Sequence, residues 1–267
     1  MNTDALKDVK AFLLDLDGTL YLGNRLFDWT PPFLATLREL GLRRLFMTNN
    51  SSRNAVSYTE KLRRLGVDAE PEEIITSGQS AALYLSEQPD IRTVYVLGTE
   101  SLADDVRAAG KTVVAEGADA VLVGYATNLE FEGLSRAAIE LQHGARFLAT
   151  HPDRVCPDPR GMLPDCGAMC ACLASAVGRE PDHVFGKPSP WMLRLATERA
   201  GLPAAAMALV GDRLYTDIQM ALDSGMPAVL VLSGETTREA LATSGVQPDL
   251  VFENVGELAL ALRRLHQ

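Results

Sequence analysis

One stretch of sequence decides the fold, Ala11-Phe12-Leu13-Leu14-Asp15-Leu16-Asp17-Gly18-Thr19-Leu20. Its apolar residues, together with Val9 just before them, predict a buried strand of a parallel sheet. Asp15 and Asp17 are two positions apart, so in an extended chain their side chains point the same way. Gly18 then allows the chain to turn sharply. The sequence therefore predicts two carboxylates side by side, just beyond the carboxyl end of a core strand.

Two carboxylates this close repel each other, and a cation lying between them relieves that repulsion. Two neighbouring carboxylates offer only oxygen ligands, which suit a hard ion such as magnesium. A solvated acidic turn after a core strand would contain the same residues. The pair alone leaves both interpretations open, and the rest of the chain has to decide between them.

Size and composition are those of a globular protein. The 267 residues suffice for one large domain or two ordinary ones, with 47% hydrophobic and 22% charged residues. A formal net charge of -10 argues against nucleic acid or an anionic membrane as a partner. The sequence has no apolar run of membrane-spanning length, and its first ten residues lack the features of a signal peptide. We therefore expect a soluble, cytoplasmic protein.

The four cysteines all lie within one segment, as Cys156, Cys166, Cys170 and Cys172. Without an export signal, reduced thiols are expected in preference to disulfides. Three of them, together with His151, could in principle bind zinc, but their spacing matches no common zinc pattern. Buried free thiols are the favoured interpretation.

Strand-like and helix-like segments alternate along the whole chain, which predicts an α/β fold with parallel strands. Strands are expected near residues 9–14, 44–47, 74–76, 93–97, 111–115, 120–123, 146–149, 207–210, 227–232 and 250–252. Helices are expected near residues 30–40, 54–65, 79–85, 100–109, 131–142, 167–177, 189–200, 218–224, 237–243 and 255–265. Residues 21–29 and 151–165 are predicted as loops, and the length of the second predicts a functional role. No GxGxxG dinucleotide fingerprint is present.

Four polar clusters each follow a predicted core strand. They are Asp15 with Asp17, Thr48 with Asn49, Lys187, and Asp212 with Asp217. In an open parallel sheet the carboxyl ends of the strands lie along one edge, where ligands bind, so these residues are expected to meet there. Carboxylates for a cation, a hydroxyl for phosphate oxygens and a lysine for negative charge suit phosphoryl transfer, which depends on positioning and charge neutralisation.

This set resembles the four motifs of the haloacid dehalogenase (HAD) superfamily. The residues around three of these motifs resemble its NagD-like, p-nitrophenyl phosphatase branch (subfamily IIA, with a C2-type cap). They are Thr48-Asn49-Asn50-Ser51, Phe185-Gly186-Lys187-Pro188 and Gly211-Asp212-Arg213-Leu214-x-Thr216-Asp217-Ile218. The resemblance spans nearly the whole chain. It implies a Rossmann-like parallel-sheet core, residues 1–78 and 184–267, and an inserted α/β cap domain, residues 79–183.

Carried across by position, the resemblance implies a role for each motif residue. Asp15 is expected to be the nucleophile and Asp17 the general acid and base. The expected ligands of magnesium (Mg2+) are Asp15, Asp17 through its backbone carbonyl, and Asp212, with Asp217 supporting them. The phosphoryl group is expected to bind Thr48, Asn49 and Lys187. The cap loop contributes His151, Asp153 and Asp165 as residues that contact the leaving group, or that only form hydrogen bonds within the loop.

The function that the resemblance implies is magnesium-dependent hydrolysis of small phosphate monoesters, such as a sugar phosphate or a nucleotide, through an aspartyl-phosphate. The expected partner is a small phosphorylated metabolite, and the cap could support a homodimer. A phosphomutase or another phosphoryl transferase on the same scaffold is an alternative, as is a protein that binds a phosphorylated ligand without catalysis. Pro164-Asp165-Cys166-Gly167 departs from the commoner Pro-Gly-x-Gly of the cap, which leaves the substrate open.

Overall fold

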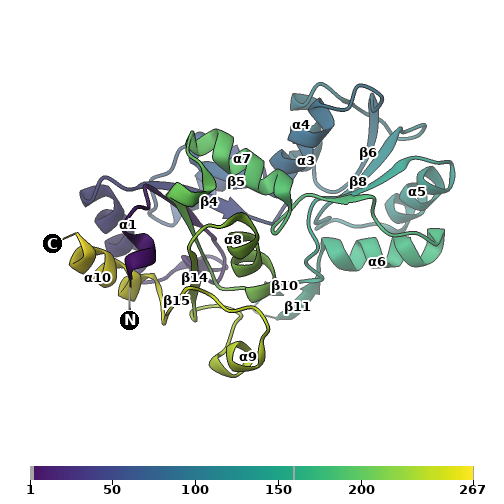
Figure 1. The fold of residues 1–267 in the computed structure, drawn as a ribbon. Coiled ribbons are helices and arrows are strands. Elements are labelled where there is room, and N and C mark those ends of the chain that lie inside the picture. The colour runs from purple at the N-terminus through teal and green to yellow at the C-terminus, as the bar shows by residue number, and fades with distance from the viewer. Residues whose placement is uncertain (1–2, 159, 267) are drawn as a thin grey trace. The chain divides into compact units, whose positions relative to one another are not determined.

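The computed structural model describes residues 3–158 and 160–266 and divides into two compact units (Figure 1). The first unit comprises Met1–Thr48, Thr59–Ile75 and Leu193–Gln267. The second comprises Asn49–Tyr58 and Thr76–Met192. Both are built from sheets with helices, so the predicted α/β class is confirmed. The assignment of residues 79–183 as an inserted cap stays a prediction.

The sheet of the first unit has six strands in the order β15-β14-β13-β1-β4-β5. Their bounds are β1 Ala11–Leu14, β4 Arg43–Thr48, β5 Ile74–Thr76, β13 Met207–Gly211, β14 Ala228–Val231 and β15 Leu250–Phe252. The strand β1 runs parallel to β4 and β13, with Leu14 opposite Phe46 and Val210. All four residues of β1 are fully buried, because helices cover both faces of a sheet of this kind. The central strand therefore delivers its following residues to the middle of the sheet edge.

The helices of the first unit begin and end where local sequence signals place them. They are α1 Thr30–Glu39, α8 Gln219–Ser224, α9 Arg238–Thr243 and α10 Val255–Leu265, while α2 Ala55–Arg64 and α7 Pro190–Ala200 extend into both units. Two prolines occupy the first turn of α1, where their missing N–H groups cost no hydrogen bond. Asn254 caps α10 by accepting hydrogen bonds from the N–H groups of Gly256 and Glu257. The two helices α1 and α10 pack together.

The sheet of the second unit has five parallel strands in the order β12-β9-β8-β6-β7. Their bounds are β6 Thr93–Leu97, β7 Thr112–Val113, β8 Ala120–Val123, β9 Arg146–Ala149 and β12 His183–Val184. Its helices are α3 Ser77–Ser86, α4 Glu100–Ala108, α5 Phe131–Gln142 and α6 Cys166–Val177.

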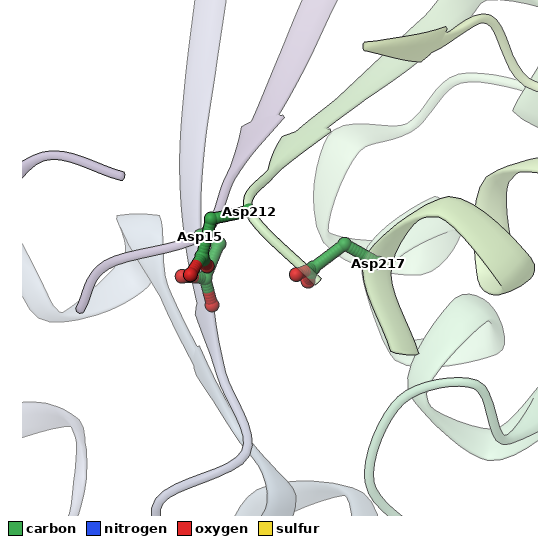
Figure 2. Close-up of side chains that lie close together, drawn as sticks. All are labelled: Asp15, Asp212 and Asp217. Atoms are coloured by element: carbon green, nitrogen blue, oxygen red, sulfur yellow. The ribbon is translucent and has the colours of Figure 1, made fainter. Parts of the chain in front are cut away.

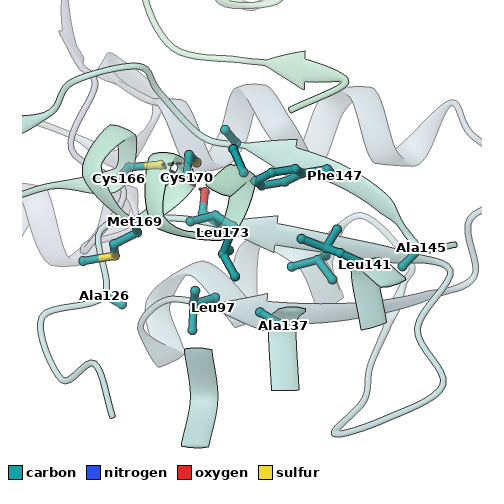
Figure 3. Close-up of a cluster of buried hydrophobic side chains, with 14 of the residues drawn as sticks. Leu97, Ala126, Ala137, Leu141, Ala145, Phe147, Cys166, Met169, Cys170 and Leu173 are labelled. Atoms are coloured by element: carbon teal, nitrogen blue, oxygen red, sulfur yellow. Dashed lines mark hydrogen bonds between the residues drawn. The ribbon is translucent and has the colours of Figure 1, made fainter. Parts of the chain in front are cut away.

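Alternate residues of β8 enter two different cores, as the two-residue period of a strand requires. Val121 and Val123 pack with α5 and α6 in the cluster that contains Phe147 and Leu173 (Figure 3). Ala120 and Leu122 belong to the cluster that includes residues of α3 and α4. The second sheet is therefore covered by helices on both faces and has a hydrophobic core on each side.

Both predicted loops contain short hairpins, so these two predictions were wrong. The first hairpin pairs β2 Tyr21–Leu22 with β3 Arg25–Leu26, and the second pairs β10 Val155–Asp158 with β11 Gly161–Pro164. Most residues of the second hairpin are exposed or half-buried, so no alternation of buried and exposed positions marks it in the sequence. Backbone pairing, to which the apolar pattern gives no clue, forms both hairpins.

The helix predicted at residues 79–85 begins two residues earlier, because α3 starts at Ser77. Thr76 accepts a hydrogen bond from the N–H of Gln79, and the Gln79 side chain accepts one from the N–H of Thr76. This reciprocal arrangement is a capping box, which starts a helix. Gly78 allows close helix packing, because a Cβ there would lie 2.6 Å from Oδ2 of Asp105 on α4. The described residues include no helix that is both long enough and apolar enough to cross a membrane.

Asp105, half-buried between α3 and α4, is expected to make stability depend on pH. Burial, and then the charge of Asp104, raise its pKa to about 7. A carboxyl whose folded-state pKa is raised contributes stability below its unfolded pKa, and this contribution is lost as the pH rises through about 7. We expect Asp105→Asn to be more stable than the native protein at pH 8.5. The expected gain is about 2 kcal/mol, because solvent screens part of the cost of the buried charge.

Urea unfolding at pH 5 and pH 8.5 measures this effect, with Asp8→Asn, at an exposed aspartate, as the matched control. The gain should be clearly larger at pH 8.5 than at pH 5, where only part of the penalty is present. An Asp105→Asn variant that shifts stability equally at both values would contradict the assignment.

Candidate active site

Three carboxylates gather at the carboxyl end of the central strands of the first unit (Figure 2). Asp15 follows β1, and its N–H donates to the carbonyl of Val210 on the neighbouring strand β13 at 2.9 Å. Asp212 follows β13, and Asp217 lies on the π-helical turn Leu214–Ile218. One oxygen of each side chain lies within 4.8 Å of the others, and all three residues are buried. Residues about two hundred positions apart therefore lie close together, as expected for residues that follow neighbouring strands of a parallel sheet.

Three glycines form a close-fitting wall around these carboxylates. Gly18 has a φ of +89°, and a Cβ there would lie 2.5 Å from Oδ2 of Asp212. A Cβ on Gly234 would lie 2.0 Å from the same oxygen. A Cβ on Gly211 would lie 2.3 Å from Cγ of Asp217. Any side chain at these positions would displace a carboxylate, so glycine is required for the backbone to approach it this closely.

Hydrogen bonds fix only part of the Asp212 carboxylate. Its Oδ2 accepts from the N–H of Glu235 at 2.6 Å, whereas its buried Oδ1 has no hydrogen-bond partner among the described residues. Burial, followed by the charges of Asp15 and Asp217, raises the pKa of Asp212 well above its usual value. The N–H of Arg213 donates to Asp217 at 3.1 Å. A cluster of buried carboxylates in which one oxygen has no hydrogen-bond donor offers suitable ligands for a divalent cation.

Asp17 is less buried than the other three aspartates and has a different environment. Burial raises its pKa, while the charge of Lys61, the N–H of Gly23 and the charge of Arg213 lower it. The N–H of Gly23, in the turn of the β2–β3 hairpin, lies 3.5 Å from Oδ1 of Asp17. A carboxyl group that burial helps to keep protonated is suited to donate and accept a proton.

Thr48 ends β4, the strand beside β1, and its buried position lies at the same edge of the sheet as Asp15. The hydroxyl of Thr19 lies 3.4 Å from Oδ2 of Asp15, a contact that sequence reasoning did not assign. The role of Gly234 was also missed. Its place directly after β14 was the available signal, because such loops line the carboxyl edge of a parallel sheet.

Asn49 and Lys187 pair with each other within the second unit. The N–H of Lys187 donates to Oδ1 of Asn49 at 2.7 Å, and Nδ2 of Asn49 donates to the Lys187 carbonyl at 3.3 Å. Both residues are buried. The strand before Lys187 is β12, which pairs with β9 in the five-stranded sheet, so the prediction that Lys187 follows a strand of the core sheet was wrong. That Lys187 joins the carboxylates in a shared site stays a prediction.

The three candidate residues of the cap loop also come together within the second unit. His151, Asp153 and Asp165 are all buried, and the histidine lies between the two aspartates. His151 therefore lies near both aspartates, and contact of these residues with a leaving group stays a prediction.

All four cysteines are free thiols, two of them buried, with Sγ of Cys166 and Sγ of Cys170 4.0 Å apart. Among the described residues, the one group of three potential metal ligands is Asp15, Asp212 and Asp217. No zinc cluster of cysteines with His151 is therefore found in that part of the chain. A parallel α/β sheet with this carboxylate group at its edge is typical of enzymes of phosphoryl transfer.

Comparison with known families agrees with this class. Residues 12–112 match the family model of haloacid dehalogenase-like hydrolases, and residues 184–258 match a second model of HAD-like hydrolases. An acid sugar phosphatase from Staphylococcus aureus is 35% identical over 260 residues, which is 97% of this chain and 100% of the relative. The chain belongs to the haloacid dehalogenase-like hydrolase family, and it is a phosphoric monoester hydrolase of that family.

Solved structures give the same result. A 4-nitrophenylphosphatase from Thermotoga maritima is 40% identical, with a TM-score of 0.92 over 97% of this chain and 99% of its own. NagD from Escherichia coli K-12 is 31% identical, with a TM-score of 0.85 over 93% and 98%. A glycerol phosphate phosphatase from Mycobacterium tuberculosis, in complex with magnesium, is 33% identical, with a TM-score of 0.87 over 100% and 79%.

The close approach of Gly234 to Asp212 predicts a loss of activity in Gly234→Ala. The added methyl would lie 2.0 Å from Oδ2 of Asp212 and would displace this carboxylate. Because a misplacement of about 1 Å can reduce catalysis about 100-fold, we expect kcat/KM to fall by at least that factor. Hydrolysis of 4-nitrophenyl phosphate measures this.

Gly245→Ala is the matched control, because a Cβ at Gly245 has no neighbour within 4 Å. It should retain native activity. Comparable activity in the two alanine variants would show that the close approach of Gly234 to Asp212 is not needed.

Proposed function

We propose that this phosphatase hydrolyses small phosphate monoesters with magnesium, through a covalent aspartyl-phosphate on Asp15. The observation that carries the proposal is the buried group of Asp15, Asp212 and Asp217, in which Oδ1 of Asp212 has no hydrogen-bond donor among the described residues. Carboxylates crowded in this way repel one another, so a stable arrangement needs a positive charge among them.

Asp15 and Asp212 would hold magnesium through their side chains and Asp17 through its backbone carbonyl, with Asp217 beside them. When bound, the cation neutralises phosphoryl oxygens that would otherwise repel the carboxylate of Asp15. Oxygen ligands of this kind suit magnesium, and a relative of this chain has been solved in complex with it.

In the proposed reaction, Asp15 and Asp17 have different roles. The carboxylate of Asp15 attacks phosphorus, the bond from phosphorus to the alcohol oxygen breaks, and Asp17 donates a proton to that oxygen. Asp17 then accepts a proton from water as the water oxygen attacks the same phosphorus. The bond between phosphorus and Asp15 breaks, which releases inorganic phosphate and restores both carboxyl groups.

We assign binding of the phosphoryl oxygens to Thr48 and Lys187, with Asn49 helping. The hydroxyl and the ammonium group supply a donor and the positive charge that a phosphoryl group requires. The reciprocal hydrogen bonds between Asn49 and the backbone of Lys187 restrict where the lysine side chain begins. This support suits a residue that has to present its charge in one direction.

Small phosphorylated metabolites are the proposed substrates. The relatives that support this class are named for sugar phosphate, glycerol phosphate and 4-nitrophenyl phosphate. Assay of the purified chain against sugar phosphates, glycerol phosphates and nucleoside monophosphates distinguishes among them. We also propose that residues 79–183 act as the cap that selects among these esters.

Asp15→Asn is expected to abolish turnover, because an amide cannot attack phosphorus and form the covalent intermediate. Phosphate release with magnesium present should fall by at least about 1,000-fold. Denaturing mass spectrometry of the native protein quenched during turnover should detect the added phosphoryl mass. Undiminished turnover by Asp15→Asn would exclude the proposed nucleophile.

Magnesium is expected to stabilise the folded protein, because it binds carboxylates that the unfolded chain does not bring together. At 100 times the dissociation constant the gain is about 2.7 kcal/mol, or about 5 °C in the melting temperature. Differential scanning fluorimetry with magnesium or with a chelator measures the shift.

Asp212→Asn should be at least as stable as the native protein in the chelator, since one buried charge is removed, and should lose the magnesium shift. Asp8→Asn should keep the shift. A magnesium shift that survives in Asp212→Asn would place the cation elsewhere.

A further inference from the structure

A buried histidine in the second unit lies between two carboxylates. Nδ1 of His151 is 3.7 Å from Oδ2 of Asp153, and Nε2 is 3.4 Å from Oδ1 of Asp165. Neither nitrogen forms a hydrogen bond of ordinary geometry within the described part of the chain, although the ring is fully buried. Each ring nitrogen therefore faces a carboxylate oxygen at a distance longer than an ordinary nitrogen–oxygen hydrogen bond.

The Asp165 side of this arrangement is anchored to helix α6. Oδ1 of Asp165 accepts a hydrogen bond from the N–H of Cys166 at 2.7 Å, at the start of the helix. The N–H of Gly167 donates to the carbonyl of Asp153 at 2.8 Å. A Cβ on Gly167 would lie 2.2 Å from the carbonyl oxygen of Pro152. The backbone that carries His151 and Asp153 is therefore held closely against the first turn of α6.

The Asp153 side leads to Asn49 and Lys187. Nδ2 of Asn49 lies 3.3 and 3.4 Å from the two oxygens of Asp153. An acidic partner fixes the orientation of the amide, because only its NH2 group can donate to a carboxylate. The Asn49 oxygen consequently faces the other way and accepts from the N–H of Lys187 at 2.7 Å. Asp153 thus reinforces the amide orientation in which Asn49 holds the backbone of Lys187.

Gly186 brings the two ends of this network together. A Cβ there would lie 2.6 Å from Cβ of His151 and 2.7 Å from Oδ1 of Asn49. The backbone before Lys187 therefore lies directly against both side chains, with no space for a further methyl group. A shift of the histidine or of the amide would be transmitted to Lys187 without a flexible segment in between.

We infer that His151 is a positioning residue for Lys187. Its Nδ1 side holds the Asp153 carboxylate against Asn49, and Asn49 in turn fixes the backbone of the lysine. This inference rests on the proposed function, in which Lys187 binds the phosphoryl group. It gives His151, Asp153 and Asp165 a structural link to the reaction in place of direct contact with the leaving group.

Two substitutions at His151 distinguish the contact of Nδ1 with Asp153 from the contact of Nε2 with Asp165. In His151→Asn the amide nitrogen can take the place of Nδ1 and face Asp153, whereas in His151→Gln it can take the place of Nε2 and face Asp165. We expect His151→Asn to stay within about 3-fold of native activity. We expect His151→Gln to raise KM, and the inhibition constant of inorganic phosphate, by about 10-fold or more, with a smaller change in kcat.

We would also measure the melting temperatures of both variants. Lys187→Ala serves as the reference for complete loss of the lysine side chain. Equal effects of the two substitutions at equal melting temperature, or no effect of either, would overturn the inference. Crystal structures of the two variants measure the distance from Oδ1 of Asn49 to the Lys187 nitrogen directly. That contact should persist in His151→Asn and lengthen in His151→Gln.

The structural measurement keeps the inference separate from the proposed function. If Lys187→Ala binds inorganic phosphate as tightly as the native protein, the proposed role of Lys187 fails. The crystal structures then still decide whether His151 positions it. An unchanged Asn49–Lys187 contact in His151→Gln would refute the positioning role even if the phosphatase activity is confirmed.

Discussion

Mutual repulsion among three buried carboxylates is the constraint on which the first unit depends. Asp15, Asp212 and Asp217 lie within 4.8 Å of one another away from solvent, and their proximity contributes to the raised pKa of Asp212. A fold tolerates such a group only where strong packing holds it in place. The central strand β1, buried along its whole length between β4 and β13, supplies that support. The repulsion that costs stability in this place is the same property that attracts a cation.

Close approach of the backbone to charged side chains recurs in both units. In the first unit, Gly18, Gly211 and Gly234 leave no room for a Cβ beside the aspartates. In the second unit, Gly167 and Gly186 allow the backbone to contact the segment around His151. In each unit the glycines make a close-fitting enclosure in which a small displacement of a neighbouring group has no space to be absorbed. Preorganisation of this kind is what phosphoryl transfer requires from a protein.

Much of the site was predictable because short-range patterns encode it. The apolar run before Asp15, the run before Asp212 and the one ending at Thr48 each mark a buried strand, and parallel strands place their carboxyl ends along one edge. The hairpins at residues 21–26 and 155–164 were not predicted, because most of their side chains are exposed or half-buried and show no apolar pattern. The strand before Lys187 was assigned to the wrong sheet, because its two residues are exposed and carry no periodic signal.

By itself, the sequence determined the α/β class, the strand-end carboxylates and the family, since local periodicity and motif spacing carry that information. Only the tertiary structure decided which sheet takes β12, that Gly234 lies against Asp212, and that His151 lies between Asp153 and Asp165. Each of these depends on how the chain packs within a folded unit. No local pattern specifies them, because the free energy that fixes such contacts comes from packing of the whole unit.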